Sequence, residues 1–190
     1  MRTSALALPF ALAFGVFVVQ TAPLNAQEPQ KLNSGLQTAV LVPVGKYSDS
    51  YVLGGNLTYF VEKFWGQNAV RGRIGVSYHR PSAPEFGMSA GSNSFLTGIN
   101  IDWLHSFGSS GMGFYTSAGL GFVRYKSTIQ LYVDNNYFAS DEVSGNELTF
   151  DLALGYRISR HFSIEAGHAF SLKNDADWPR VIGLALGYRF

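Results

Sequence analysis

The sequence predicts an all-β fold: an eight-stranded antiparallel up-and-down transmembrane β-barrel after an N-terminal signal peptide. Three observations support this prediction. The 190-residue chain is 46% hydrophobic but only 14% charged, whereas a typical soluble domain is about 25% charged. Large apolar side chains alternate with small or polar ones over segments of about ten residues, the length that a tilted transmembrane strand needs. The links between these segments alternate between short and long, as in membrane barrels.

The composition excludes several classes of function. Lys and Arg number 14 against 13 Asp and Glu, so no basic excess is available to neutralise a nucleic-acid backbone. The chain has no cysteine, which removes disulfide frameworks, thiolate zinc sites and cysteine nucleophiles together. We therefore expect no nucleic-acid partner, no cofactor and no metal site.

The first segment, 1–26, has the layout of a secretory signal peptide. Arg2 precedes an apolar run over 5–19, and the segment ends in Leu24-Asn25-Ala26. The alternative is an uncleaved anchor, but a helix needs roughly 20 apolar residues to span a membrane. We expect cleavage after Ala26, a short segment over 27–35, and a barrel over 36–190.

The expected strands come in a regular order. They cover 36–45, 52–63, 69–80, 95–105, 112–126, 147–158, 161–171 and 180–190. Between Leu148 and Tyr156 every second residue is large and apolar, and the residues between them are small or polar. A strand over these residues would therefore have one apolar face. The same pattern runs through 70–79 and 95–103. Alternation alone also fits a soluble, lipocalin-like barrel that holds a ligand in its centre.

The connections and aromatic residues favour a membrane barrel over a soluble one. Short links lie at 64–68, 106–111 and 159–160, and longer ones span 81–94, 127–146 and 172–179. Aromatic residues gather near the strand ends, where two interfacial girdles would form. They are Phe64, Trp65, Trp103, Phe107, Tyr156, Phe162, Tyr188 and Phe190 on the short-turn side, and Tyr51, Tyr78, Phe122, Tyr125, Phe170 and Trp178 on the other.

The second face of each strand then fills the barrel interior. Eight strands leave a bore just wide enough for side chains, so we expect a filled lumen; the alternative is a narrow pore. Inward glycines leave room for long charged side chains, and equal numbers of acids and bases suit a closed ionic network. The members are Glu62, Arg71, Arg73, Asp102, Asp151, Arg157, Glu165 and Arg189. Alternatively, Glu62 and Arg71 sit in water at the strand ends.

The C-terminal residues VIGLALGYRF place a terminal Phe after apolar residues at alternate positions. These residues are Ile182, Leu184, Leu186, Tyr188 and Phe190. The pattern resembles the signal by which bacterial outer-membrane barrels are recognised for assembly. The opening VPVGKYSDSYVLGGNLTYF, followed by NAVRGRIGVSYHR, is similar to the small outer-membrane barrels of OmpA and OmpX type.

The resemblance covers nearly all of 36–190 and implies several properties. It implies residence in the outer membrane with both ends of the barrel domain in the periplasm, and insertion by the barrel assembly machinery. It also implies contact with outer-membrane lipid and lipopolysaccharide, in a barrel that we expect to be a monomer.

The longest external segment, 127–146, is a candidate interaction site. Alternating apolar residues at its start and Asn135-Asn136 at its middle allow the hairpin to continue above the membrane as a β-ribbon. Such an edge can recruit a partner strand, so we expect a structural role or surface adhesion to an extracellular protein or ligand. The alternative is a solvated loop without a partner. The candidate residues are Tyr132, Asp134, Tyr137, Phe138, Asp141 and Glu142.

Catalysis is the competing class, because some barrels of this shape modify lipid A. His161, Ser163 and Glu165 alternate on one strand. That strand begins at a short turn, which puts His161 on the periplasmic side, away from the outer leaflet. We therefore expect no enzyme activity, and we expect His79 and His168 to be rim or interface histidines.

Overall fold

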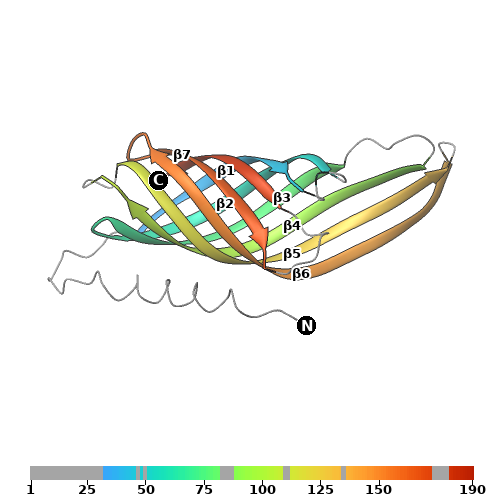
Figure 1. Cartoon of the computed structure of the whole chain (residues 1–190), viewed down its shortest axis with the longest axis horizontal. Coiled ribbons are helices and arrows are strands. Elements are labelled where there is room, and N and C mark those ends of the chain that lie inside the picture. The colour runs from blue at the N-terminus through green and yellow to red at the C-terminus, as the bar shows by residue number, and fades with distance from the viewer. Residues whose placement is uncertain are drawn as a thin grey trace. The chain divides into compact units, whose positions relative to one another are not determined.

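The computed structural model shows eight antiparallel strands that follow one another around a closed barrel in sequence order (Figure 1). The structure describes residues 32–45, 48, 51–81, 88–108, 112–133, 136–172 and 180–190, with backbone alone at 81, 88–93, 128–133, 136–141 and 143. The strands are β1 (Leu32–Pro43), β2 (Tyr51–Trp65), β3 (Asn68–Pro81), β4 (Met88–Ser106), β5 (Gly113–Val133), β6 (Asn136–Arg157), β7 (Phe162–Ser171) and β8 (Val181–Arg189). The predicted fold class is confirmed.

Pairing between the first and last strands closes the barrel. The ladder between β1 and β8 runs from Gly35 opposite Arg189 to Pro43 opposite Val181. β1 begins at Leu32, so the prediction that 27–35 precedes the barrel is wrong for its last four residues. They are held as strand because each of them lies opposite a residue of β2. The predicted signal peptide, 1–26, lies outside the described residues, and no helix among the described residues is long and apolar enough to cross a membrane.

The two ends of the barrel differ. At the short-turn end, brief links join β2 to β3, β4 to β5 and β6 to β7, and this end also holds the start of β1 and the end of β8. At the other end, here called the extended end, β4, β5 and β6 continue beyond the remaining strands (Figure 1). The predicted link 81–94 is therefore too long: Met88–Ser94 is strand, paired with Ser127–Val133 of β5. Most of 127–146 is strand that continues the hairpin of β5 and β6, in agreement with the β-ribbon that the sequence allowed.

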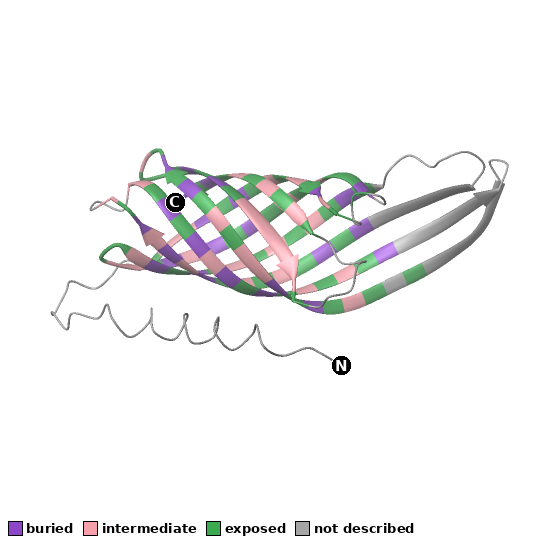
Figure 2. Cartoon of the chain, in the orientation of Figure 1, coloured by how far each residue is buried: buried purple, intermediate pink, exposed green. Residues whose placement is uncertain are grey.

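Exposed residues alternate with less exposed ones along the strands (Figure 2), and large apolar side chains are exposed on every strand. On β6, Leu148, Leu152 and Leu154 are exposed, whereas Glu147 and Arg157 are buried. A soluble barrel would show the reverse, since its large apolar side chains would form the core. The lipocalin-like alternative is therefore wrong.

Aromatic rings pack against one another at the short-turn end. Ring centroids lie 5.1 Å apart for Trp65 and Trp103, and 4.8 Å apart for Phe114 and Tyr156. The expectation that Tyr51 belongs to the opposite girdle is wrong, because its side chain is only 7% exposed and points into the barrel. Trp178 lies outside the described residues.

Candidate functional site

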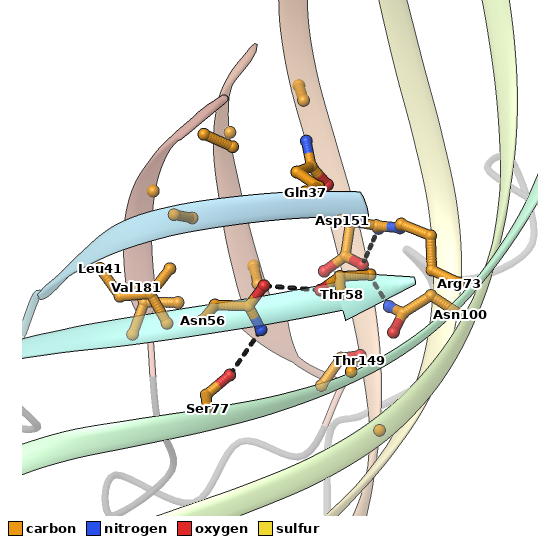
Figure 3. A pocket seen from close by; sticks show the side chains of 18 of the residues that line it. Gln37, Leu41, Asn56, Thr58, Arg73, Ser77, Asn100, Thr149, Asp151 and Val181 are labelled. Carbon is orange, nitrogen blue, oxygen red and sulfur yellow. Dashed lines mark hydrogen bonds and ion pairs between the residues drawn. The ribbon is translucent and has the colours of Figure 1, made fainter. Parts of the chain in front are cut away.

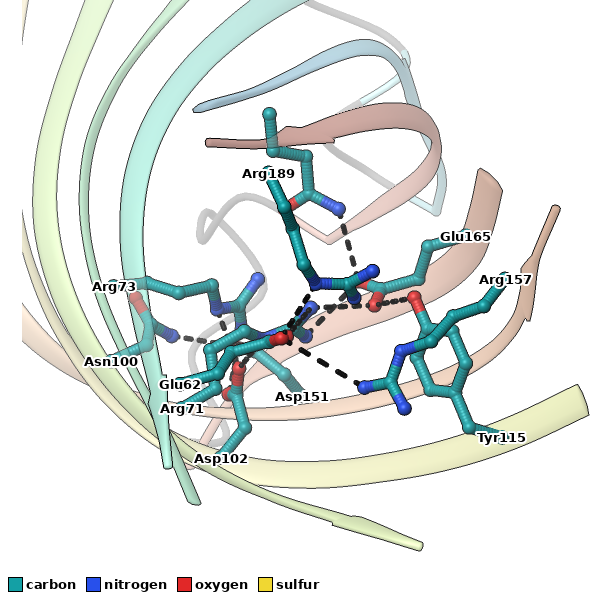
Figure 4. A network of polar contacts seen from close by, with 11 residues as sticks. Glu62, Arg71, Arg73, Asn100, Asp102, Tyr115, Asp151, Arg157, Glu165 and Arg189 are labelled. Atoms are coloured by element: carbon teal, nitrogen blue, oxygen red, sulfur yellow. Dashed lines mark hydrogen bonds and ion pairs between the residues drawn. The ribbon is translucent and has the colours of Figure 1, made fainter. Parts of the chain in front are cut away.

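Arg71 is the centre of an ionic network inside the short-turn half of the barrel (Figure 4). Its Nε donates to Asp102 Oδ2 at 2.8 Å, its Nη1 donates to Glu165 Oε2 at 2.9 Å, and Glu62 lies 4.0 Å away. The contacts continue from these partners until all eight predicted lumen charges are connected: Glu62, Arg71, Arg73, Asp102, Asp151, Arg157, Glu165 and Arg189.

Arg73 extends the network toward the extended end. Its Nε lies 2.7 Å from Asp102 Oδ2, and its Nη2 donates to Asp151 Oδ2 at 2.9 Å. Asn100 donates to the same oxygen of Asp151. The Arg73 and Asp151 side chains are each 17% exposed, so this edge of the network is the one most open to the space above it.

Glu62 links two further arginines at the short-turn side. Arg189 Nε donates to Glu62 Oε2 at 2.9 Å, and Arg157 Nη2 lies 3.9 Å from the same oxygen. Arg157 also donates to Ser106 Oγ at 2.9 Å. The side chains of Glu62 and Arg71 are 0% and 3% exposed, so the alternative in which they sit in water is wrong.

Tyr115 is a network member that the sequence did not reveal. Its hydroxyl donates to Glu165 Oε2 at 2.9 Å, and its ring lies 4.7 Å from the Arg157 guanidinium. The Phe64 ring is 4.6 Å from the same guanidinium, so Arg157 lies between two aromatic faces. A Cβ on Gly155 would overlap the Tyr115 ring, which shows why this neighbour is glycine.

Apolar side chains complete the filling of this half. Leu104, Ala69 and Tyr115 form a buried cluster, on which Phe64 packs. Tyr115 shares the inward parity of Gly119 and Gly121, and that parity was the one available signal for its position.

Each charge of this network lies within 4.0 Å of an opposite charge, and the network and the Tyr115 cluster fill the short-turn half of the lumen with side chains. The network contains four carboxylates and four guanidinium groups, which leaves no net charge to attract a counter-ion. In the part of the chain that the structure describes, no group of three or more His, Asp or Glu residues could hold a metal ion.

The extended half of the lumen holds a cavity of about 180 Å³ (Figure 3). The prediction of a completely filled lumen is therefore wrong in this half. Small inward residues leave the space: Ala39, Gly75, Gly98, Ala153, Gly167, Ala169, Gly183 and Ala185. Its polar lining includes Gln37, Asn56, Thr58, Asn100, Thr149 and Asp151.

A layer of buried polar side chains lies in the lumen toward the extended end, and one of its members, His79, lines the cavity. The hydroxyls of Tyr51 on β2 and Ser127 on β5 lie 2.9 Å apart across the lumen. The His79 ring lies 6.2 Å from the Tyr51 ring and is only 1% exposed, so its assignment as a rim or interface residue is wrong. Ser171 donates to buried Glu147 at 2.7 Å, and no pattern in the sequence predicted this pair.

The catalytic alternative gains no geometric support. His161 Nδ1 is 2.9 Å from the Arg189 carbonyl oxygen, and its ring stacks on Tyr188. Ser163 is buried, and the Glu165 carboxylate accepts a hydrogen bond from Arg71. No described contact joins His161 to Ser163. The other candidate, His168, is half-buried on β7 beside Phe170, with ring centroids 5.4 Å apart.

The predicted interaction residues fall mostly beyond what the structure describes. Glu142 is exposed, and its Oε2 lies 2.9 Å from Lys126 Nζ. Asp134 lies outside the described residues, as do the side chains of Tyr132, Tyr137, Phe138 and Asp141. The apolar residues of the predicted assembly signal, Ile182 to Phe190 at alternate positions, are exposed on the outer face of β8 and at its end. Their role in assembly stays a prediction.

No protein-family model and no curated protein matches the sequence, whereas the barrel is similar to several solved structures. The outer-membrane protein Ail of Yersinia pestis in a lipid nanodisc has a TM-score of 0.54 at 17% identity, over 84% of this chain and 100% of that one. The fold is thus that of the small eight-stranded outer-membrane barrels.

Two further structures have the same architecture. Neisserial surface protein A has a TM-score of 0.52 at 11% identity, over 85% of this chain and 98% of that one. The N-terminal barrel of Pseudomonas aeruginosa OprF has a TM-score of 0.52 at 13% identity, over 86% of this chain and 100% of that one. Ail, the attachment invasion locus protein, is also known in complex with the heparin analogue sucrose octasulfate; that structure has a TM-score of 0.50 at 18% identity, over 84% of this chain and 96% of that one.

Proposed function

We propose that the chain is an integral outer-membrane protein that binds an extended segment of an external protein along its β4–β5–β6 sheet. In this arrangement the short-turn end faces the periplasm and the extended end faces outward, as short and long connections do in outer-membrane barrels. The exposed apolar band on every strand supplies the lipid contact, including contact with lipopolysaccharide in the outer leaflet.

One observation carries the binding proposal: two strands of the extended sheet continue beyond their ladders with the neighbouring strands β3 and β7. Among the described residues, β6 pairs with β7 only from Thr149 onward, although β6 itself starts at Asn136. On the other side, β4 pairs with β3 only from Ser94 onward, although it starts at Met88. A strand that extends beyond its neighbour in a sheet can add a further strand through main-chain hydrogen bonds.

The filled short-turn half of the lumen supports binding, and not transport, as the main activity. A transport function needs a continuous path, but the ionic network and the Tyr115 cluster fill the short-turn half. A lipid-modifying activity needs a nucleophile within hydrogen-bond reach of a base, and His161 and Ser163 lack that contact. Ail of Yersinia pestis, the attachment invasion locus protein, has the same fold, which gives the proposed adhesion a precedent in another protein.

Shortening the ribbon tests the proposal. A variant in which a two-residue turn replaces 128–142 keeps the pair Ser127 opposite Val143 and removes the hairpin beyond it. Both proteins, in lipid nanodiscs, are screened against a phage-displayed library of random linear peptides. We expect peptides that bind the full chain and lose binding to the shortened variant, and that also lose binding when their backbone amides are methylated.

Two results would contradict strand addition. Selected peptides could bind the shortened variant equally well, or the methylated peptides could retain their affinity. Sucrose octasulfate serves as the comparison probe: if it alone binds, and does so equally to both variants, the surface recognises sulfated sugars through another site. Heat-modifiable gel mobility shows that each variant has folded.

Insertion into the outer membrane has its own test. We expect the mature chain to begin at Gln27, and we expect deletion of Phe190 to leave export intact while reducing insertion. N-terminal sequencing and quantification of the membrane fraction measure these outcomes. A mature chain that retains 1–26, or unchanged membrane levels without Phe190, would overturn the respective assignment.

A further inference from the structure

We propose that the cavity in the extended half of the lumen binds a small, neutral molecule that carries a hydroxyl group on a hydrocarbon body. The cavity is a separate site from the sheet edges of β4 and β6, so the ligand proposal and the strand-addition proposal can fail independently. The cavity volume is about 180 Å³. An apolar cavity of about 150 Å³ in another protein takes up benzene, so a ligand of roughly that size fits here.

The floor of the cavity offers hydrogen bonds but no free charge (Figure 3). Arg73 is paired with Asp102 and Asp151, and Asn100 donates to Asp151. An ionic ligand would therefore be buried without a counter-ion, at a cost of several kcal/mol. This balance of charge restricts the ligand to neutral molecules.

Thr149 supplies the polar group that points to a ligand. The residue lines the cavity, is only 7% exposed, and its hydroxyl has no hydrogen-bond partner among the described residues. A Cβ on Gly121 would collide with both the Thr149 hydroxyl and the Asn100 amide, so glycine at 121 keeps room for these two groups. A buried hydroxyl without a partner is costly, and a ligand hydroxyl would remove that cost.

Part of the remaining wall is apolar, beside polar side chains such as Asn56, Thr58 and Ser77. Leu96 and Val123 face the cavity from β4 and β5, and alanines line it from β6, β7, β8 and β1. Away from the floor, Leu41 and Val181 lie together at the other end of the cavity (Figure 3), and both are partly exposed. A molecule that enters beside these two residues with its hydroxyl first would reach Thr149 and leave its hydrocarbon against the apolar wall.

Benzyl alcohol is the probe, and benzoate is its charged counterpart with the same ring. Both are titrated into protein labelled with 13C at alanine methyl groups, in lipid nanodiscs. We expect saturable shifts of the inward Ala153 and Ala169 methyls with benzyl alcohol, and binding of benzoate about 100-fold weaker or more. The outward Ala166 methyl should change only in proportion to the alcohol dissolved in lipid.

Two substitutions on β7 make the matched comparison. Ala169→Leu fills the cavity and should abolish the saturable shift of the Ala153 methyl, whereas Ala166→Leu adds the same volume on the lipid face and should leave it unchanged. Thr149→Val keeps the shape and removes the hydroxyl, so affinity should fall by roughly 2- to 10-fold. If Ala169→Leu does not fold, Ala153→Leu fills the same space from β6, and the Ala169 methyl is then observed.

Three results would overturn the proposal. The first is an absence of any saturable shift, in which case the cavity holds water only. The second is equal affinity for benzoate and benzyl alcohol. The third is saturable binding that survives both cavity-filling substitutions in proteins with normal heat-modifiable mobility.

Discussion

The two halves of the lumen are built by the same eight strands but are filled in opposite ways. In the short-turn half, Arg71, Tyr115 and Leu104 bring long side chains to the axis, and each charged group meets a partner. In the extended half, alanine and glycine line the strands, and a cavity remains. The position of a residue in the alternating pattern therefore sets only the direction of its side chain, whereas the volume of the side chain decides whether the bore is filled.

The most damaging change should be loss of the central guanidinium in the filled half. Arg71→Met removes one of the two guanidinium partners of Asp102 and leaves the buried Glu165 carboxylate without its ion pair. We expect the free energy of unfolding to fall by about 3–5 kcal/mol, measured by urea denaturation in lipid vesicles. Lys126→Met is the control, because its ion pair with Glu142 is exposed and should contribute less than about 1 kcal/mol. Similar losses for both would mean that the lumen network is solvated.

A change on the lipid face should have a smaller effect and should be independent of the lumen. Leu152 is 47% exposed on the outer face of β6, opposite His168 of β7. Leu152→Arg would place a charge in the apolar band and destabilise the barrel by about 2–4 kcal/mol in vesicles. Leu152→Ala should cost much less. The reverse order would show that this face packs in a protein core.

Two glycine substitutions sharpen the comparison between the halves. In Gly155→Ala the new methyl group meets the Tyr115 ring, which Glu165 and Arg157 hold in place, and we expect a loss of about 1–3 kcal/mol. In Gly183→Ala it meets the end of the Leu41 side chain at 3.0 Å, and this side chain can move toward the cavity.

We therefore expect Gly183→Ala to change stability by no more than about 1 kcal/mol, since it also restricts the unfolded chain. Both variants are compared by urea unfolding in the same vesicles. Equal losses at Gly155 and Gly183 would show that the two halves are packed equally tightly.

The smallest expected effect concerns the layer above the cavity. Tyr51→Phe removes the hydroxyl that contacts Ser127 across the lumen, and we expect a loss of about 0.5–1.5 kcal/mol. Tyr59→Phe is the control, because this ring is exposed on the outer face of the same strand, β2. A variant at Tyr51 as stable as the one at Tyr59 would show that the cross-lumen contact adds nothing to stability.

Alternation allowed the sequence to predict which face of each strand is polar. It placed Leu152 outside and Asp151 inside, and it brought eight charges to one lumen before any contact was known. Alternation was less informative for aromatic residues. Aromatic side chains near strand ends occur both in interfacial girdles and in lumens. The sequence pattern therefore predicted the wrong face for Tyr51 and did not predict that Tyr115 lies in the lumen.

The remaining features depend on partners distant in the chain. Met88–Asn93 contains mostly small and polar residues, which have little intrinsic preference for strand, and it becomes strand because β5 lies beside it. The cavity depends on the sum of side-chain volumes contributed by all eight strands. Neither the pairing of Met88–Asn93 nor the cavity can therefore be predicted from the sequence of one strand.

The ladder between β1 and β8 has a consequence for how the barrel forms. Ser34 O accepts a hydrogen bond from Phe190 N at 2.9 Å, so neighbours in the finished ladder are separated by almost the whole described chain. Until β8 arrives, β1 and β7 each present an unpaired edge, and the entropy of closing so large a loop has no compensating contacts. Folding intermediates that lack this last seam would therefore be the species most prone to aggregate, and a factor that holds the two edges apart until they meet would determine the yield.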